Sequence, residues 1–302
     1  MKQAPILLMT YIRPQNTDLL IRLLRKYNKS KIIVFNDGLK NIKHKLLQKQ
    51  TREIILKHKK NSNLITIFPK KNLTQKNNLP YALKKVFRKN DRAIILEDDC
   101  IPNKSFFKFC NILLEKYKDD SRISQISGNN FLNFKFFKRR NNDSYFFSNF
   151  TSSWGWATWK KKWEEAYDLN IKIWPKIKKE QWLLDFFHNK KSVKFWTKAF
   201  DRRYKLLDDD WDRPWTLANL VNNRLNIFPN KNLISNIGED KAALHSNPKK
   251  WNKLKLESMK FPLKHPQIIT CDRNVDNFLT NEGFSIPKFS FRLKNKIKKL
   301  FF

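Results

Sequence analysis

The 302-residue chain has few cysteines, and they form neither a disulfide framework nor a recognisable zinc site. Cys100, Cys110 and Cys271 are odd in number, without a Cys-x-x-Cys pair and without histidines at zinc-finger spacing. A disulfide framework in a small secreted protein uses an even set, and a structural zinc site uses closely spaced ligand pairs. The sequence therefore predicts reduced thiols, a cytoplasmic location and no structural zinc.

Long apolar runs are also missing. No segment approaches the roughly 20 apolar residues that a membrane-spanning helix needs. The short run Ile6-Leu7-Leu8-Met9 follows Pro5 and precedes Tyr11-Ile12-Arg13-Pro14, so no signal-peptide core forms. Internal repeats and linkers rich in Pro, Gly or Ser are absent as well, so we expect one domain over residues 1–285.

Acidic residues are in the minority, with 27 Asp and Glu against 63 Lys and Arg and a formal charge of +36. Such an excess indicates polyanionic surroundings, such as nucleic acid, an anionic membrane face or phosphorylated substrates. The basic residues are spread along the chain, with runs at 57–60, 176–179 and 294–299. A nucleic-acid module more often concentrates them among aromatic residues, so nucleic acid is the less favoured partner.

The most informative stretch is Ala93–Pro102, where an apolar run ends in Glu97-Asp98-Asp99. Apolar residues bounded by charge are typical of a strand buried on both faces, as in a parallel sheet covered by helices. Ligands of open α/β sheets bind beyond the carboxyl ends of the strands. Three acids there suit a hard divalent cation that also carries substrate phosphates, although a solvated acidic turn has the same sequence.

The first 120 residues alternate apolar strands with amphipathic helical segments. This order is the signature of a doubly wound α/β fold with a mostly parallel sheet flanked by helices. Further strands are expected at 123–127, 145–150 and 225–228. The expected strands and helices of the first part cover residues 5–10, 19–24, 31–35, 42–47, 64–68, 81–87, 93–96 and 106–114.

The second part is rich in tryptophan and contains another acidic cluster. Trp154-Gly155-Trp156 lies in a stretch, 151–159, that we expect to lead into a helix. Glycine permits a close backbone approach and flat aromatic rings suit the apolar face of a sugar, although core packing is the commoner use of tryptophan. Residues 170–206 have a helical pattern, and Asp208–Asp212 forms the second acidic cluster. Residues 286–302 mix apolar and basic side chains, which is typical of an amphipathic segment at an anionic membrane surface.

Taken together, these motifs resemble those of bacterial glycosyltransferases with the GT-A fold, the group called family-2-like or hemolytic-protein-like, and more distantly the N-acetylglucosaminyltransferase I family. The resemblance covers about residues 4–246, with a nucleotide-sugar-binding half at 1–120 and an acceptor half at 121–250. The motifs that carry it, in chain order, are Tyr11-Ile12-Arg13-Pro14, Phe35-Asn36-Asp37-Gly38, Ile95-Leu96-Glu97-Asp98-Asp99, Ile126-Ser127-Gly128-Asn129, Trp154-Gly155-Trp156-Ala157-Thr158-Trp159, Trp211-Asp212 with Trp215, and Ser235-Asn236-Ile237-Gly238 before His245.

The resemblance implies a Rossmann-like transferase of polysaccharide biosynthesis that uses a UDP-sugar donor, Mn²⁺ or Mg²⁺ and a saccharide or lipid-linked glycan acceptor. By position it assigns the metal to Asp99 and His245, and acceptor deprotonation with inversion to Asp212. Trp154, Gly155 and Trp156 are the expected platform for the sugar or acceptor. The resemblance predicts that the nucleotide sugar contacts Tyr11, Arg13, Asp37, Glu97 and Asp98. Asp37 is expected to hydrogen-bond the base, and Asp98 to lie near the ribose or a metal-bound water.

Two departures from the family pattern bear on the site. The loop from Gly238 to His245 lacks a second glycine, and residue 74, where a glycine is expected after Leu73, is Thr74. Two other functions are compatible with the residues: a metal-dependent phosphate-ester hydrolase that uses the clusters at Asp99 and Asp212, and a basic protein that binds nucleic acid or an anionic surface. The hydrolase is disfavoured because no His-rich two-metal pattern accompanies the acids.

Overall fold

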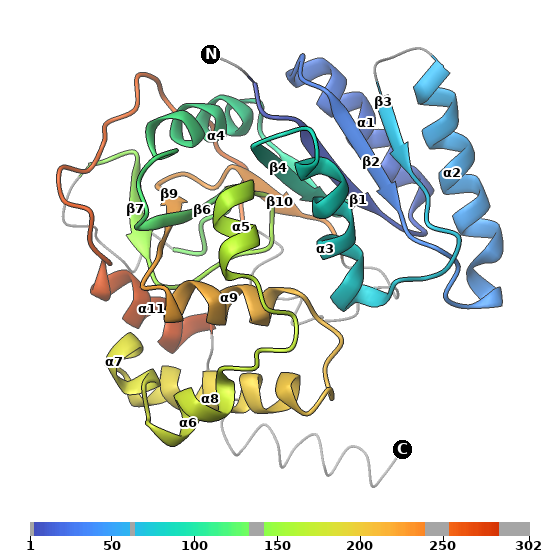
Figure 1. Ribbon diagram of the computed structural model, residues 1–302. Coiled ribbons are helices and arrows are strands. Elements are labelled where there is room, and N and C mark those ends of the chain that lie inside the picture. The colour runs from blue at the N-terminus through green and yellow to red at the C-terminus, as the bar shows by residue number, and fades with distance from the viewer. Residues whose placement is uncertain (1–2, 61–63, 133–141, 239–253, 284–302) are drawn as a thin grey trace, which may run out of the picture.

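The computed structural model describes residues 3–60, 64–132, 142–238 and 254–283, and these form an α/β fold around an eight-stranded sheet (Figure 1). The strand order is β3-β2-β1-β4-β8-β6-β9-β7. The four strands β3, β2, β1 and β4 are mutually parallel, as are β6 and β9. The predicted α/β class with a large, mostly parallel sheet is therefore confirmed. The strands of this sheet are β1 (Ile6–Thr10), β2 (Ile32–Asn36), β3 (Leu64–Ile67), β4 (Arg92–Glu97), β6 (Ile123–Ser127), β7 (Tyr145–Ser148), β8 (Trp156–Trp159) and β9 (Leu225–Pro229).

Helices cover both faces of the sheet, which explains why its first strands are apolar throughout. In β1, Ile6 and Leu8 pack with one layer of helices and Leu7 and Met9 with the other, as the alternation of a strand requires. The first layer contains α1 (Pro14–Tyr27), α2 (Lys45–Lys60) and α4 (Lys104–Lys116), and the second contains α3 (Thr74–Phe87), α5 (Lys160–Ala166) and α9 (Asp212–Val221).

A third apolar cluster lies beyond the end of the sheet that β7 and β9 form (Figure 1). It is built from α6 (Trp174–Lys179), α7 (Leu183–Phe187), α8 (Lys190–Tyr204) and α11 (Arg273–Gly283), which pack with α9. The sequence predicted one helical stretch over 170–206, whereas the structure has two short helices, α6 and α7, followed by the 15-residue α8. Gln181 and His188 adopt left-handed backbone conformations (φ 60° and 47°), and these interrupt the helix on either side of α7.

Other boundaries differ from the sequence predictions for identifiable reasons. The stretch expected to lead directly into a helix contains β8, a four-residue strand that is buried between β4 and β6 and therefore shows no polar alternation. A second, two-stranded sheet pairs β5 (Cys100–Pro102) with β10 (Ile234–Asn236), which are too short to be recognised by pattern. Helix α3 begins at Thr74 rather than Tyr81 and contains Pro80. A 3₁₀ turn at Ile42–His44 precedes α2.

Two predicted features, the basic segment 286–302 and His245, lie outside the described residues. None of the described helices has the length and the apolar composition that a membrane crossing requires.

Candidate functional site

Three neighbouring parallel strands end at the same edge of the sheet and bring the predicted polar residues together. Met9 pairs with Glu97, and Thr10 pairs with Asn36, so β1, β2 and β4 end at one level. The chain passes from β1 to β2 on one side and later returns to β4 on the other, so β1 and β4 flank a topological switch point. The loops that follow these strands hold Arg13 and Asp98 at the place where open α/β sheets bind ligands.

Arg13 is the cation nearest these acids in the described structure. Its Nη1 donates to Asp98 Oδ1 at 2.6 Å and to Asp99 Oδ2 at 3.3 Å. The other oxygen of Asp98 accepts the Tyr11 backbone N–H at 3.2 Å. All three charged side chains are largely buried, so the loop after β1 and the loop after β4 are fastened to each other.

The acidic strand end carries more negative charge than Arg13 balances. Burial, together with the charges of Asp99, Asp98 and Asp212, raises the pKa of Glu97 to about 8, while the charge of Arg13 opposes the shift. Burial likewise raises the pKa of Asp98 to about 6, against the stabilising charge of Arg13. The effect of Asp212 on Glu97 places the first turn of α9 within electrostatic reach of this cluster.

The structure adds a neighbour to Asp99 that lies far away in the sequence. The pairing of β5 with β10 brings the Ile237 N–H to within 2.8 Å of the Asp99 carbonyl oxygen. A Cβ on Gly238 would lie 2.5 Å from Asp99 Oδ2, so a side chain is excluded at this position. Gly238 therefore lets the backbone approach the carboxylate closely, and the chain continues from there toward His245, outside the described residues.

Whether a divalent cation fits here depends on the donors. Among residues 3–60, 64–132, 142–238 and 254–283, no group of three or more His, Cys, Asp and Glu side chains is arranged to hold a metal ion. The acids at β4 nevertheless supply carboxylate oxygens, which Mg²⁺ and Mn²⁺ prefer as ligands. The donor chemistry thus fits a cation that draws further ligands from substrate phosphates.

Asp37, predicted to contact the nucleotide base, joins the loop after β2 to the loop before α3. Its Oδ1 accepts the N–H groups of Gly38 at 2.7 Å and Leu73 at 3.0 Å, and its Oδ2 accepts Asn72 Nδ2 at 3.2 Å. A Cβ on Gly38 would collide with the backbone at Lys71 and Asn72. Oδ2 retains a lone pair for a ligand donor, since a carboxylate oxygen can accept more than one hydrogen bond.

Two residues near this loop were missed by sequence reasoning. Arg52 of α2 donates to Asn36 Oδ1 at 2.8 Å and to the Asp37 carbonyl at 3.1 Å, which fixes the end of β2. His44 contacts the hydroxyl of Tyr11 through Nδ1 at 3.1 Å, and their rings meet edge to face at 5.6 Å. Neither residue stood out in the sequence, because Lys and Arg are common throughout the chain and surround both positions.

Thr74, at the position where the sequence pattern predicts a glycine, adopts a backbone conformation that favours glycine. Its φ is 63°, in the left-handed region that β-branched residues rarely adopt. Asp209, from the loop before α9, accepts Thr74 Oγ1 at 2.9 Å and the N–H groups of Gln75 and Lys76 at 3.1 and 3.3 Å. Asp209 therefore caps the amino end of α3 and links the loop before α9 to this helix.

We expect Asp209→Ala to lower the free energy of unfolding by about 1 to 2 kcal/mol, the usual cost of losing a cap. Asp209→Asn should cost less than Asp209→Ala, because its amide keeps one of the two acceptor oxygens that Asp209 uses. Urea denaturation of both variants measures the difference. An alanine variant as stable as the wild type would show that the cap does not contribute.

The second acidic cluster contains two acids paired with arginines, one that caps α3 and one without a cation partner among the described residues. Asp208 pairs with Arg202 and Arg213, and Asp210 pairs with Arg213. Burial raises the pKa of Asp210 to about 7, with a further contribution from the charge of Asp212. Asp212 is exposed in the first turn of α9, where its Oδ1 accepts the N–H of Arg213 at 2.9 Å. Within the described part of the chain no Lys, Arg or His side chain forms an ion pair with Asp212.

The predicted aromatic platform loses one member. Trp156 is 0% exposed, and its ring stacks on Trp211 at 5.4 Å and packs against Trp163 and Trp215. The pattern could not distinguish a buried indole from an exposed one. Trp154 is half-buried beside Phe131 and remains accessible in part, so the prediction of a sugar platform is wrong for the Trp156 ring and stays a prediction for Trp154.

Gly155 has a structural role in this stretch. Its φ is 61°, and a Cβ would lie 2.6 Å from Ile234 of β10. Its carbonyl accepts the N–H of Gly128 at 2.7 Å. The glycine thus turns the chain into β8 beneath the second sheet, where no side chain fits.

Trp156→Ala should lower the free energy of unfolding by about 3 to 5 kcal/mol, because it removes a buried ring and leaves a cavity. Trp182→Ala is the matched control, since Trp182 is 45% exposed and its loss should cost less than about 1 kcal/mol. Chemical denaturation compares the two. A cost for Trp156→Ala as small as that of the control would contradict its place in the core.

The chain was compared with protein-family models and with curated protein sequences, and neither comparison gave a match.

Proposed function

We propose that the protein is a metal-dependent glycosyltransferase of the GT-A type, which transfers a sugar from a UDP-sugar to a hydroxyl group of a saccharide or lipid-linked glycan. The observation that supports this proposal best is the gathering of Arg13, Asp98 and Asp99 at the switch point of the sheet, within electrostatic reach of Asp212. The carboxyl edge of an open α/β sheet beside a switch point is where such folds bind nucleotides. The sequence resemblance points to the same residues independently.

The nucleotide half supplies the donor contacts. Tyr11 and Arg13 line the nucleotide pocket from the loop after β1, Asp37 accepts a hydrogen bond from the base through Oδ2, and Asp98 lies near the ribose. Asp99, together with His245, would hold Mn²⁺ or Mg²⁺. When bound, the ion neutralises charge on the departing diphosphate.

Asp212 is the residue of the acceptor half assigned to proton transfer. The acceptor oxygen bonds to the anomeric carbon of the donor sugar, the bond from that carbon to the phosphate oxygen breaks, and the hydroxyl proton passes to the Asp212 carboxylate. Attack from the side opposite the leaving group inverts the anomeric centre. Arg213 and Arg202 keep Asp208 and Asp210 engaged, which leaves Asp212 as the acid able to accept the proton.

The hydrolase alternative uses the same acids but requires two metal sites about 4 Å apart. The pairing of Asp208 and Asp210 with arginines leaves Asp212 alone in its cluster, which disfavours a second metal there. The nucleic-acid alternative depends on the high positive charge, which is spread along the chain rather than concentrated in one module.

A thermal-shift panel tests the proposal. The protein is heated with UDP, GDP, CDP, ADP and the corresponding nucleotide sugars, each with Mn²⁺, Mg²⁺ or EDTA. A ligand at 100 times its Kd stabilises the native state by about 2.7 kcal/mol, so UDP with Mn²⁺ should raise the melting temperature by several degrees. No metal-dependent shift with any nucleotide would overturn the proposal.

A further inference from the structure

The carboxyl end of α8 exposes large apolar side chains that neither packing nor local conformation explains. Tyr204, Leu206 and Leu207 are 46%, 65% and 62% exposed, and they fall within four consecutive residues. Leu206 also has a φ of 57°, in the left-handed position that ends a helix and that favours glycine or asparagine. Leucine at this position is unfavourable both for its exposure and for its backbone, which indicates a contact outside the folded chain.

This tip, residues 204–207, is rigid rather than loosely held. Leu206 and Leu207 donate backbone hydrogen bonds to Arg203 and Arg202 at 3.1 and 2.9 Å, which closes the end of α8. Asp208, the next residue, is paired with Arg202 and Arg213. A hydrogen-bonded turn therefore holds the exposed side chains in place. Because they bury little apolar area, they contribute little to the stability of the free protein.

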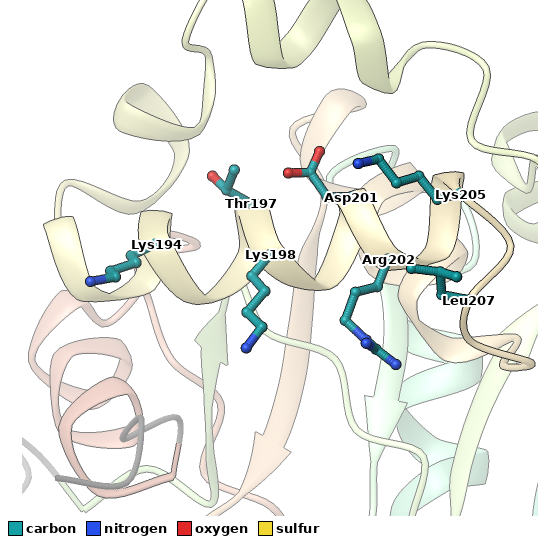
Figure 2. Close-up of a pocket in the computed structure, with 7 residues that line it drawn as sticks. All are labelled: Lys194, Thr197, Lys198, Asp201, Arg202, Lys205 and Leu207. Atoms are coloured by element: carbon teal, nitrogen blue, oxygen red, sulfur yellow. The ribbon is translucent and has the colours of Figure 1, made fainter. Parts of the chain in front are cut away.

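Cations flank the tip along α8. Lys194, Lys198 and Arg202 project from the same side of the helix, and Leu207 lies beside Arg202 (Figure 2). Lys194, Lys198 and Lys205 are exposed, and no carboxylate of the described residues forms an ion pair with them. Over residues 170–207 the sequence has eleven Lys and Arg and three Asp and Glu. Apolar and aromatic side chains beside lysines match the chemistry of an anionic membrane interface.

We propose that the tip of α8 inserts Leu206 and Leu207 into the interface of an anionic membrane while Lys194, Lys198 and Lys205 contact the lipid headgroups. This surface belongs to the described fold and is separate from the segment 286–302. It requires no sugar transfer, so it stands whether or not the proposed function does. If both hold, Asp212, five residues after Leu207, operates close to the lipid surface.

The face of α2 is the strongest rival, because it also combines lysines with exposed Ile42, Leu46 and Leu56. It has no exposed aromatic residue, and Leu46 and Leu56 lie in regular helix, where leucine costs nothing in backbone conformation. The α2 face therefore provides the matched control.

The experiment measures binding of the full chain to vesicles of phosphatidylcholine with and without phosphatidylglycerol. The triple variant Lys194→Glu, Lys198→Glu, Lys205→Glu is compared with Lys45→Glu, Lys57→Glu, Lys60→Glu on α2, which has the same net charge. Each cation at an anionic surface contributes about fivefold to the partition coefficient, so the α8 triple should lose on the order of 100-fold and the α2 triple much less. Equal losses in the two triples, or a larger loss in the α2 triple, would overturn the proposal.

The apolar part is tested by Leu206→Gly with Leu207→Ser. This double variant should bind anionic vesicles at least about fivefold more weakly, because buried apolar area at the interface is lost. Leu206→Gly alone should raise the melting temperature of the free protein by about 2 °C, since glycine suits the left-handed turn. Wild-type binding to vesicles by the double variant would refute insertion. So would an equal loss of binding to single-stranded DNA, because DNA offers no lipid interior for the two leucines to enter.

Discussion

Asp99→Asn is expected to abolish the metal-dependent part of UDP binding while the fold remains intact. The carboxylate lies at the end of β4, next to the guanidinium of Arg13 and the backbone of Gly238. An amide of the same shape satisfies the space but is a poorer ligand for a divalent cation. A metal ion contributes several kcal/mol to charge stabilisation, so the affinity for UDP in the presence of Mn²⁺ should fall by about 100-fold or more.

Isothermal titration of UDP with Mn²⁺ or EDTA measures this loss directly. Asp119→Asn is the matched control, because Asp119 is exposed after α4, at the opposite edge of the sheet. Its UDP affinity should equal that of the wild type in both conditions. If Asp99→Asn keeps the full response to Mn²⁺, the metal role belongs to other acids.

The strands and their common edge could be predicted because a strand that is buried on both faces is a nearly continuous apolar run in the sequence. The segments that became β1, β2, β3 and β4 are apolar runs that stop at polar residues, and parallel strands place those stops together. The meeting of Arg13 with Asp98 follows from that geometry, although the sequence does not contain its distance or its orientation.

What could not be predicted depends on contacts between distant residues. Asp208, Asp209, Asp210 and Asp212 look alike in the sequence, but arginines neutralise two of them and α3 uses a third as its cap. The indole of Trp156 and that of Trp154 are separated by one glycine, and only packing assigns one to the core. Thr74 shows the converse case, in which the fold imposes a glycine-like conformation on a residue whose identity argues against it.

Asp212→Asn should preserve UDP binding and lower turnover by about 10² to 10⁴-fold, the usual contribution of a positioned general base. This loss equals about 3 to 5 kcal/mol in the activation free energy. The prediction depends on the environment of the acid: Asp212 is exposed at the start of α9 and unpaired with any described cation, and its charge reaches Glu97. Asparagine can occupy the same place and still accept the Arg213 N–H, but it cannot take a proton.

The neighbouring acids make this prediction specific. Asp209→Asn keeps one of the two acceptor oxygens of the cap on α3 and should retain most of the turnover, although it alters the charge of the same loop by the same amount. Release of UDP from UDP-sugars, measured with the acceptor present and absent, follows transfer and hydrolysis separately. A large loss in Asp212→Asn with unchanged Asp209→Asn supports proton transfer by Asp212, because a general effect of charge would act on both variants. Equal turnover of the two variants at the wild-type rate would remove Asp212 from the chemistry and leave the acceptor proton to another group.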